Sequence, residues 1–163
     1  MILENNSHKT YSIQEAQSKL ENYCAYQERC HKEVVEKLRG MNMIPQVIDL
    51  IIVHLMDQNF LNEERFACSF ARGKHRIKYW GTIRIVNELK FRNISSYNIK
   101  TALNEISEEE YYTNFHAIAD RHWQTMKESN SFKKRKKFCD FLLRKGFESN
   151  IVYEKVKDLE GKL

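Results

Sequence analysis

Residues 85–106, IVNELKFRNISSYNIKTALNEI, carry apolar side chains at a spacing that recurs twice more in the chain. Within this stretch, apolar residues follow one another at steps of 4, 5, 5, 4 and 3. The same steps occur 51 residues earlier and 53 residues later, which indicates a tandem repeat. The matching positions are Val34, Leu38, Met43, Ile48, Ile52 and Leu55; Ile85, Leu89, Ile94, Ile99, Leu103 and Ile106; and Phe138, Leu142, Phe147, Val152, Val156 and Leu159.

Each copy predicts a helix, a turn and a second helix. The opening step of four belongs to the apolar stripe of one helix, and the closing steps of four and three belong to another. Asn42, Asn93 and Gly146 precede the apolar residue of the turn, and these residue types tolerate the left-handed backbone in which many helices end. Typical first-turn or capping residues start the second helix: Pro45, Ser95 or Ser96, and Ser149 or Asn150.

A further apolar helix precedes each pair, so the repeat is a unit of three helices. Ser12 with Glu15, and Ser107 with Glu110, have the spacing of a capping box at the starts of two of these helices. No run of alternating β-branched residues predicts a strand. We therefore predict an all-α protein, an elongated curved array of three tandem three-helix repeats. The predicted helices span residues 12–26, 30–41, 45–58, 62–78, 81–92, 96–106, 108–127, 131–145 and 149–160.

The domain organisation and the compartment follow from the same pattern. We expect a flexible polar lead at residues 1–11, followed by repeats at residues 12–58, 59–106 and 107–163. No apolar run approaches the length of a membrane span, and the lead lacks the apolar core of a secretion signal. We therefore expect a cytoplasmic protein with no membrane partner.

The cysteines, histidines and acidic residues form no catalytic or metal-binding pattern. The four cysteines have no close paired spacing, which favours buried or idle thiols. Cys30 with His31, and His116 with His122, do not place two ligands on one helix face, so we expect no metal site. The sequence contains no glycine-rich phosphate loop and no nucleophile motif. We expect a binding protein without a cofactor, not an enzyme.

Positive charge is concentrated in the later repeats. Residues 1–71 hold 7 Lys and Arg and 10 Asp and Glu, a net charge of −3, whereas residues 72–163 hold 20 and 12, a net charge of +8. Cations at a helix start oppose the helix dipole, so a basic run there suggests a role beyond solubility. Such a stripe is typical of phosphate binding or of attraction to an acidic protein surface, and a merely solvated face is the third interpretation. The two clusters are Arg72, Lys74, Arg76, Lys78 and Arg84, and Lys133, Lys134, Arg135, Lys136 and Lys137.

Two aromatic residues lie inside the first cluster. Tyr79 and Trp80 could stack on a base or anchor a protein interface. Packing in the helix junction is the alternative for Trp80, because tryptophans are highly buried on average.

Several separate motifs resemble the RecX family. Residues 60–67, FLNEERFA, are similar to the entry of its central signature, and residues 141–147, FLLRKGF, are similar to its Phe-Leu-x-Arg-Lys-Gly-Phe turn. Residues 23–38, with Arg29 and Glu33, resemble its first repeat, so the resemblance covers nearly the whole chain from about Tyr11. The central signature continues with Arg76, Lys78, Trp80, Gly81, Arg84, Ile85, Glu88, Leu89 and Ile94.

Two turns depart from the family pattern. The family often has Lys-Gly before the isoleucine of the central turn, where this chain has Arg92 and Asn93. The first repeat has Met41 and Asn42 at the matching place. Because Asn can adopt the same backbone shape as Gly, the fold prediction is unchanged, whereas the electrostatics of these turns differ.

The resemblance implies a regulator of the RecA recombinase. RecX-like proteins lie along the groove of the RecA filament on single-stranded DNA, inhibit strand exchange and the RecA ATPase, and favour filament disassembly. The implied partners are the RecA filament and single-stranded DNA, with double-stranded DNA as a further candidate, and we expect a monomer. A helical DNA-binding protein acting without RecA, and a scaffold for another protein, are the alternatives. The expected contact residues are the two basic clusters with Tyr79, Trp80, Arg144 and Lys145.

Overall fold

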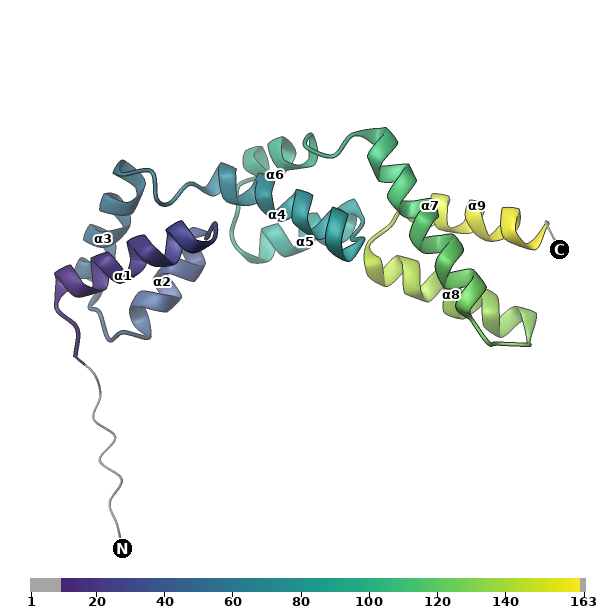
Figure 1. The fold of residues 1–163 in the computed structure, drawn as a ribbon, viewed down its shortest axis with the longest axis horizontal. Helices are drawn as coiled ribbons and strands as arrows, with labels where there is room; N and C mark the ends of the chain where they lie inside the picture. The colour runs from purple at the N-terminus through teal and green to yellow at the C-terminus, as the bar shows by residue number, and fades with distance from the viewer. Residues whose placement is uncertain (1–9, 162–163) are drawn as a thin grey trace, which may run out of the picture. The chain divides into compact units, whose positions relative to one another are not determined.

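The computed structural model describes residues 10–161, and these residues form nine α-helices and no strand (Figure 1). The predicted all-α fold is confirmed. The predicted lead, residues 1–11, lies outside the described residues apart from its last two positions. The helices are α1 (Ile13–Tyr26), α2 (His31–Arg39), α3 (Pro45–Asp57), α4 (Glu63–Lys78), α5 (Thr82–Phe91), α6 (Ser96–Leu103), α7 (Glu108–Thr125), α8 (Ser131–Lys145) and α9 (Ser149–Glu160).

The repeated apolar positions form the interior of each set of three helices. All but four of them are buried, and those four are half-buried. Val34, Ile85 and Phe138 open the three copies, and each is fully buried. The spacing therefore marks the side chains that the helices hide from water, which is the main source of stability for a helical repeat. The half-buried positions are Met43, Leu103, Ile106 and Leu159.

The predicted turn residues adopt the left-handed backbone. Asn42, Asn93 and Gly146 have φ angles of 59°, 61° and 89°. Each residue lies just after the end of a helix, where the chain must turn back toward that helix. Asparagine and glycine adopt the left-handed backbone at low energetic cost. Two further predictions are confirmed, because Ser12 and Glu15 form a capping box on α1 and Pro45 is the first residue of α3.

The chain divides into two compact units, which we name unit 1 (Met1–Phe66) and unit 2 (Ala67–Leu163), and the boundary falls inside α4. In unit 1, α3 packs against both α1 and α2. Its core gathers side chains from all three helices, such as Leu20, Leu38 and Leu55, all fully buried.

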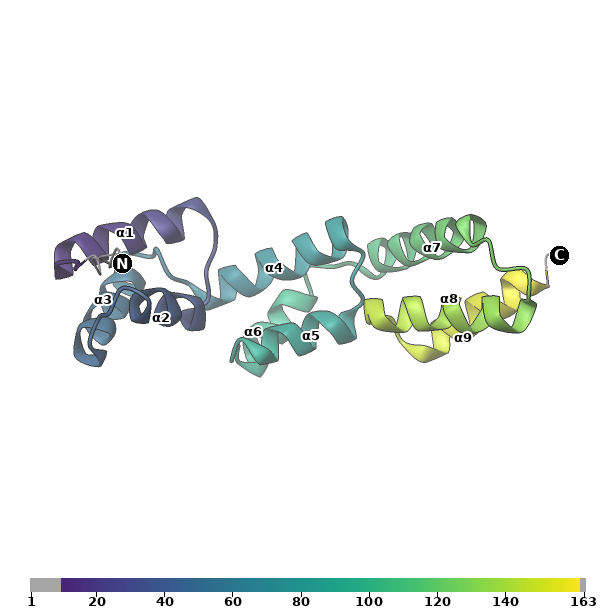
Figure 2. The ribbon, with the colours of Figure 1, turned by 90° about the horizontal axis from the view of Figure 1, so that it is seen from below.

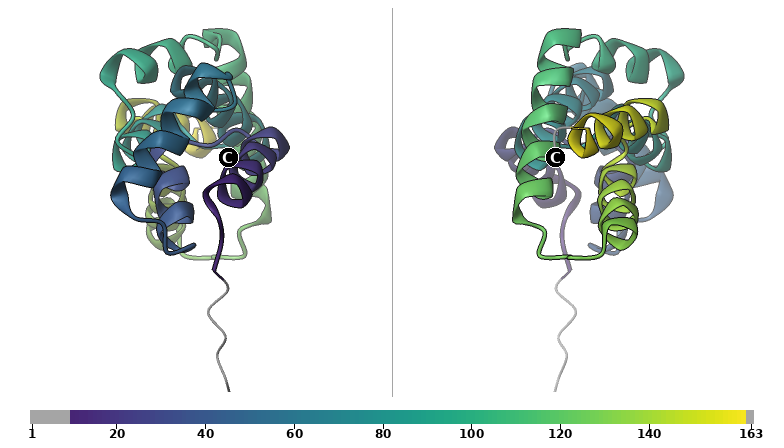
Figure 3. Two further views of the ribbon diagram at one scale, coloured as in Figure 1. Left: turned by 90° about the vertical axis from the view of Figure 1, so that its left-hand side faces the viewer. Right: turned by 90° about the vertical axis from the view of Figure 1, so that its right-hand side faces the viewer.

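Unit 2 holds the remainder of α4 and the helices α5 to α9. Helix α5 packs against α6, and α8 packs against both α7 and α9 (Figures 2 and 3). Phe115, Phe138 and Phe147 are buried in the core of α7 to α9, where Phe115 and Phe147 meet edge to face with ring centroids 5.1 Å apart. These helices position the basic residues described next.

Candidate functional site

Two glycines bring the second repeat (α4 to α6) against the third (α7 to α9) within unit 2. The Gly81 N–H donates to the Lys145 carbonyl at 2.8 Å, and the Ile83 N–H donates to the Gly146 carbonyl at 3.1 Å. A Cβ atom at Gly81 would lie 2.2 Å from the Gly146 carbonyl oxygen, and one at Gly146 would lie 2.4 Å from the Arg84 nitrogen. Backbone touches backbone here, so the junction accommodates only glycine at both positions.

A polar network secures the same junction. The Tyr111 hydroxyl donates to Glu148 Oε2 at 2.7 Å, and the Thr82 hydroxyl donates to Glu148 Oε1. The Thr82 N–H donates to the Tyr111 oxygen at 3.4 Å. Burial, followed by the bond to Glu148, raises the pKa of Tyr111 above its ordinary value. The network therefore ties the start of α5 to α7 and to the residue that precedes α9.

His75 completes the junction, and the sequence analysis did not single it out. It is fully buried, and its ring stacks on Tyr111 with centroids 5.3 Å apart. Nδ1 lies 2.9 Å from the Trp80 carbonyl, which can only accept, so Nδ1 carries the hydrogen. His75 lies four residues after Ala71 and eight after Ala67, which places it on the buried stripe of α4. This spacing is the feature of the sequence that could have indicated its burial.

Two arginines of the first predicted cluster are already paired with carboxylates. Arg72 forms an ion pair with Glu105, and Arg76 donates through Nε and Nη2 to Glu110 at 2.6 and 3.1 Å. The hydrogen bond from Arg76 lowers the pKa of Glu110 below its ordinary value. Only half of the predicted capping box forms on α7: the Ser107 hydroxyl accepts from the Glu110 N–H at 3.1 Å, but the Glu110 carboxylate accepts from Arg76 instead of closing the box.

Five other cations surround Gly81 without a carboxylate partner among residues 10–161. Lys145 Nζ donates to the Lys78 carbonyl at 2.8 Å, and Arg84 Nη1 donates to the Arg144 carbonyl at 3.1 Å. These bonds, together with Lys74 Nζ at 5.2 Å from the Trp80 ring, place the cations at the carboxyl ends of α4 and α8 and at the start of α5. We name this set the junction cluster: Lys74, Lys78, Arg84, Arg144 and Lys145.

The junction cluster concentrates positive charge. Partial burial, and then the charges of Arg84 and Lys78, lower the pKa of Lys145 below its ordinary value. The helix-end carbonyls that accept from these cations offset only part of that charge. A bound polyanion would supply the missing counter-charge, so this arrangement suits phosphate groups or an acidic protein surface.

Tyr79 and Trp80 pack within the junction. The half-buried Trp80 ring meets Phe70 edge to face at 6.2 Å, and the guanidinium of Arg84 lies over it at 4.0 Å. Tyr79 has a φ of 52°, unusual for an aromatic residue, and its hydroxyl lies 3.3 Å from Arg121 Nη2. The geometry favours the packing interpretation of Trp80, and contact of either ring with a ligand stays a prediction.

The second predicted cluster occupies the first two turns of α8. Lys137 pairs with Glu128 at 2.7 Å, and Arg135 lies 3.7 Å from Glu160. Lys134 lies over the Trp123 ring at 4.3 Å. Within the part of the chain that the structure describes, three members of the run have no carboxylate partner, and these are Lys133, Lys134 and Lys136.

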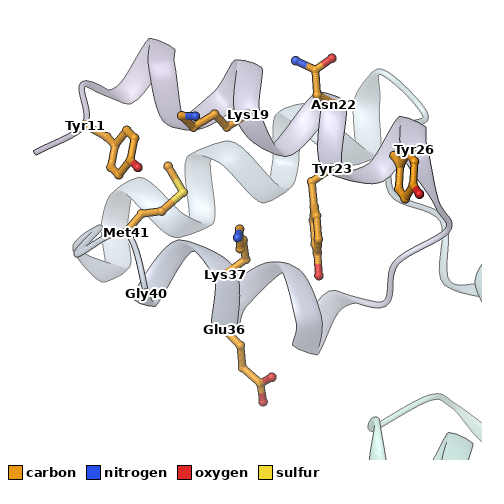
Figure 4. Close-up of a pocket in the computed structure, with 9 residues that line it drawn as sticks. All are labelled: Tyr11, Lys19, Asn22, Tyr23, Tyr26, Glu36, Lys37, Gly40 and Met41. Atoms are coloured by element: carbon orange, nitrogen blue, oxygen red, sulfur yellow. The ribbon is translucent and has the colours of Figure 1, made fainter. Parts of the chain in front are cut away.

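Unit 1 has an aromatic groove of about 650 Å³ between α1 and α2, which the sequence analysis did not identify (Figure 4). In Figure 4, Tyr23 and Lys37 point into the space between the helices, whereas Glu36 points away. Lys37 lies 5.7 Å from the Tyr23 ring, and the Arg29 guanidinium lies 3.9 Å from it. The ring of Tyr23 is therefore already in contact with cations of the same repeat.

Neither a membrane-spanning helix nor a cluster of metal ligands occurs among residues 10–161. None of these helices combines the length and the hydrophobicity needed to cross a bilayer. No three His, Cys, Asp or Glu side chains of this part of the chain gather as metal ligands would.

Two family models match most of the helical region. The model described as RecX, second three-helix domain, matches residues 62–103, and the model described as RecX, third three-helix domain, matches residues 108–156. Together they cover more than half of the chain. The chain belongs to the RecX family.

Curated relatives agree with this assignment. Regulatory protein RecX of Bacillus cytotoxicus is 23% identical over 148 residues, which are 91% of this chain and 55% of that protein. Regulatory protein RecX of Limosilactobacillus reuteri is 24% identical over 143 residues, 88% of this chain and 54% of that protein. The chain thus spans about half the length of the curated relatives it matches.

Solved RecX structures share the fold. The crystal structure of RecX from Lactobacillus salivarius matches with a TM-score of 0.75 at 25% identity, covering 91% of this chain and 96% of that one. A second crystal structure, of regulatory protein RecX, matches with a TM-score of 0.75 at 23% identity, over 89% of this chain and 74% of that one. The resemblance inferred from the motifs, and the predicted three-helix repeats, are therefore confirmed.

The junction cluster lies within the RecX matches. Lys74, Lys78 and Arg84 belong to the second three-helix domain, and Arg144 and Lys145 belong to the third. The junction cluster thus draws residues from both RecX domains.

Proposed function

We propose that this RecX-family chain is a non-catalytic regulator of homologous recombination and DNA repair. In this proposal it binds the RecA filament on single-stranded DNA, inhibits the RecA ATPase and strand exchange, and favours filament disassembly. It acts as a monomer in the cytoplasm, where the filament forms. Membership of a family of regulatory proteins supports this role.

The observation that carries the proposal is the junction cluster. Five cations lacking carboxylate partners among the described residues surround a junction held together by backbone contacts at Gly81 and Gly146. Preformed positive charge binds an anionic partner without a large cost of ordering side chains. A nucleoprotein filament offers DNA phosphates along its length, which fits such a surface.

The test is a titration of the chain into a RecA ATPase reaction on single-stranded DNA. We expect ATP hydrolysis to fall at amounts of the chain well below those of RecA. A variant with Lys74→Gln, Lys78→Gln and Arg144→Gln, checked by circular dichroism for unchanged helix content, is expected to inhibit less. Unchanged hydrolysis with the natural sequence would contradict the proposal.

The junction cluster also supports a second candidate function, DNA binding without RecA. This alternative predicts tight binding to bare DNA that weakens steeply with salt, together with an unaffected RecA ATPase. Neutralising the α8 run, Lys133 to Lys137, would weaken that binding similarly on all sequences. Running the two assays side by side separates the two functions.

A further inference from the structure

One face of α3 in unit 1 exposes a row of apolar side chains. Leu50, Val53 and Met56 are 65%, 56% and 55% exposed. Residues three apart lie on the same side of a helix, so the three side chains form one stripe. The opposite side of α3 is buried through Ile48, Ile52 and neighbouring residues. A contiguous row of exposed apolar side chains is typical of a surface that binds another molecule.

The other repeats provide an internal comparison. Helices α3, α6 and α9 occupy the same place in the three copies, because Ile48, Ile99 and Val152 are equivalent and all buried. The positions equivalent to the apolar stripe are polar in both other copies. The repeat fold therefore does not require apolar residues there, and the stripe is a property of the first copy alone. The equivalents in the third copy, Glu154, Lys157 and Glu160, all lie on α9, and in the second copy Thr101 lies on α6 while Asn104 and Ser107 follow its end.

The charges around the stripe indicate the chemistry of its partner. Asp49 and Asp57 are exposed on α3, and the helix contains no Lys or Arg. Residues 1–66 hold 7 Lys and Arg against 10 Asp and Glu. A phosphodiester backbone would be repelled here, whereas an apolar protein surface edged with Lys or Arg would be complementary.

We propose that this α3 face, consisting of Leu50, Val53, Met56, Asp49 and Asp57, docks on a protein subunit of the filament through an apolar patch with a basic rim. The inference rests on the proposed function. It assigns two chemistries to the chain, because the α3 face binds protein while the junction cluster binds phosphate. Burial of the apolar stripe in that interface would supply the hydrophobic part of its binding energy.

The test replaces the apolar stripe with the polar residues found at the equivalent positions of the second copy. The variant Leu50→Thr, Val53→Asn, Met56→Ser takes its residues from positions 101, 104 and 107 of the same chain. The matched control, Leu50→Met, Val53→Ile, Met56→Leu, keeps the stripe apolar. We expect the polar variant to bind RecA filaments at least about tenfold more weakly in co-sedimentation, with unchanged affinity for bare single-stranded DNA, and the control to bind normally.

A second measurement covers the case in which the polar variant fails to fold. A photo-crosslinking amino acid at position 53 of the otherwise natural chain is expected to form adducts with RecA protein and not with DNA. Adducts with DNA only, or equal filament binding by the polar variant and the natural sequence, would overturn the inference. A natural chain that is dimeric by light scattering and becomes monomeric in the polar variant would assign the face to a second copy and overturn it too.

The failure of the proposed function looks different. In that case the natural sequence itself does not bind RecA filaments or change the RecA ATPase, and the inference falls with it. If the natural sequence binds and inhibits while the polar variant does so equally well, only the α3 inference fails.

Discussion

Unit 1 and unit 2 use the same three-helix repeat but differ in the charge of their surfaces. Residues 1–66 hold 7 Lys and Arg and 10 Asp and Glu, whereas residues 67–163 hold 20 and 12. Their interiors are alike, since Leu38, Leu89 and Leu142 are equivalent and all fully buried. The buried positions of the repeat therefore specify the fold, while the solvent-facing positions are free to specify a partner.

The two units also differ in how their cations are used. In unit 1, Arg65 donates to Glu28 at 2.6 Å and to the carbonyl of Asn59 at 3.0 Å, so its charge secures the approach to α4. In unit 2, Arg72 and Arg76 likewise form ion pairs with Glu105 and Glu110, whereas the cations of the junction cluster have no carboxylate partner among the described residues. The number of basic residues is thus a poor guide to a binding surface, and the unpaired ones are the better guide.

The largest expected effect is on the glycine junction of unit 2. Gly146→Ala places a Cβ against Arg84 at a φ of 89°, and crowding plus backbone strain should lower the free energy of unfolding by about 3 kcal/mol or more. Urea denaturation followed by circular dichroism measures this. Hydrogen exchange should show lost protection in residues 67–161 and not in unit 1.

Gly73 is the matched control for that substitution. It lies inside α4, and a Cβ there would meet no atom within 4 Å. Gly73→Ala is expected to stabilise the chain by about 0.5 to 1 kcal/mol, because alanine favours the helix. Equal destabilisation by both substitutions would show that the junction is not special.

The next effect separates unpaired from paired cations. Lys74→Gln, Lys78→Gln and Arg144→Gln together should lower the salt dependence of single-stranded DNA binding by about 2 in the log–log slope, at roughly 0.7 per phosphate contact. Arg72→Gln with Arg76→Gln should change it much less, because Glu105 and Glu110 already neutralise those charges. Fluorescence anisotropy over a salt series measures both. The same loss per charge in the two variants would refute this division.

A smaller effect is expected from the polar network. Tyr111→Phe removes the hydroxyl that donates to Glu148 and should cost about 1 to 2 kcal/mol of stability. Tyr26, which is 87% exposed in unit 1, provides the control, and Tyr26→Phe should stay within about 0.5 kcal/mol of the natural sequence. Urea denaturation compares the two. A neutral Tyr111→Phe would mean that the network adds nothing to the junction.

The smallest effect is a pH dependence at Arg76. Because Arg76 lowers the pKa of Glu110 in the folded chain, the pair stabilises above the ordinary carboxyl value of 4.5, and this stability is lost as the pH falls below it. Arg76→Gln should therefore be slightly less stable than the natural sequence at pH 7, and the two should converge at pH 3. Urea midpoints at both pH values measure this, and a difference that persists at pH 3 would point to lost packing instead.

Much of the fold could be predicted from the sequence, because the same apolar spacing occurs three times and each copy supports the helices assigned in the others. The positive φ angles at Asn42 and Asn93 followed from residue type and position. The left-handed backbone of Tyr79 could not be predicted, since nothing local favours it in an aromatic residue. The contact of Gly81 with Gly146 joins residues far apart in the chain, so spacing within one repeat did not reveal it.

The candidate site was only partly predictable for the same reason. Sequence identified every member of the junction cluster, but it could not separate them from Arg72 and Arg76, whose partners Glu105 and Glu110 lie more than 30 residues away. The α3 face was visible in principle. Aligning Leu50 with Thr101 and Glu154 shows an apolar residue where the other copies are polar, but such a residue is not known to be exposed until the helices are packed.

Together the two proposals assign protein contact to unit 1 and phosphate contact to unit 2 of a chain bound to a RecA filament. Binding of the whole chain to RecA-coated and to bare single-stranded DNA, over one salt series, distinguishes this division from binding through phosphate alone. Tighter binding to the coated DNA is expected at every salt concentration, with a similar slope against salt, because the apolar α3 contact adds affinity that salt does not screen and adds no phosphate contact. Equal affinity for coated and bare DNA over the whole series would rule this division out.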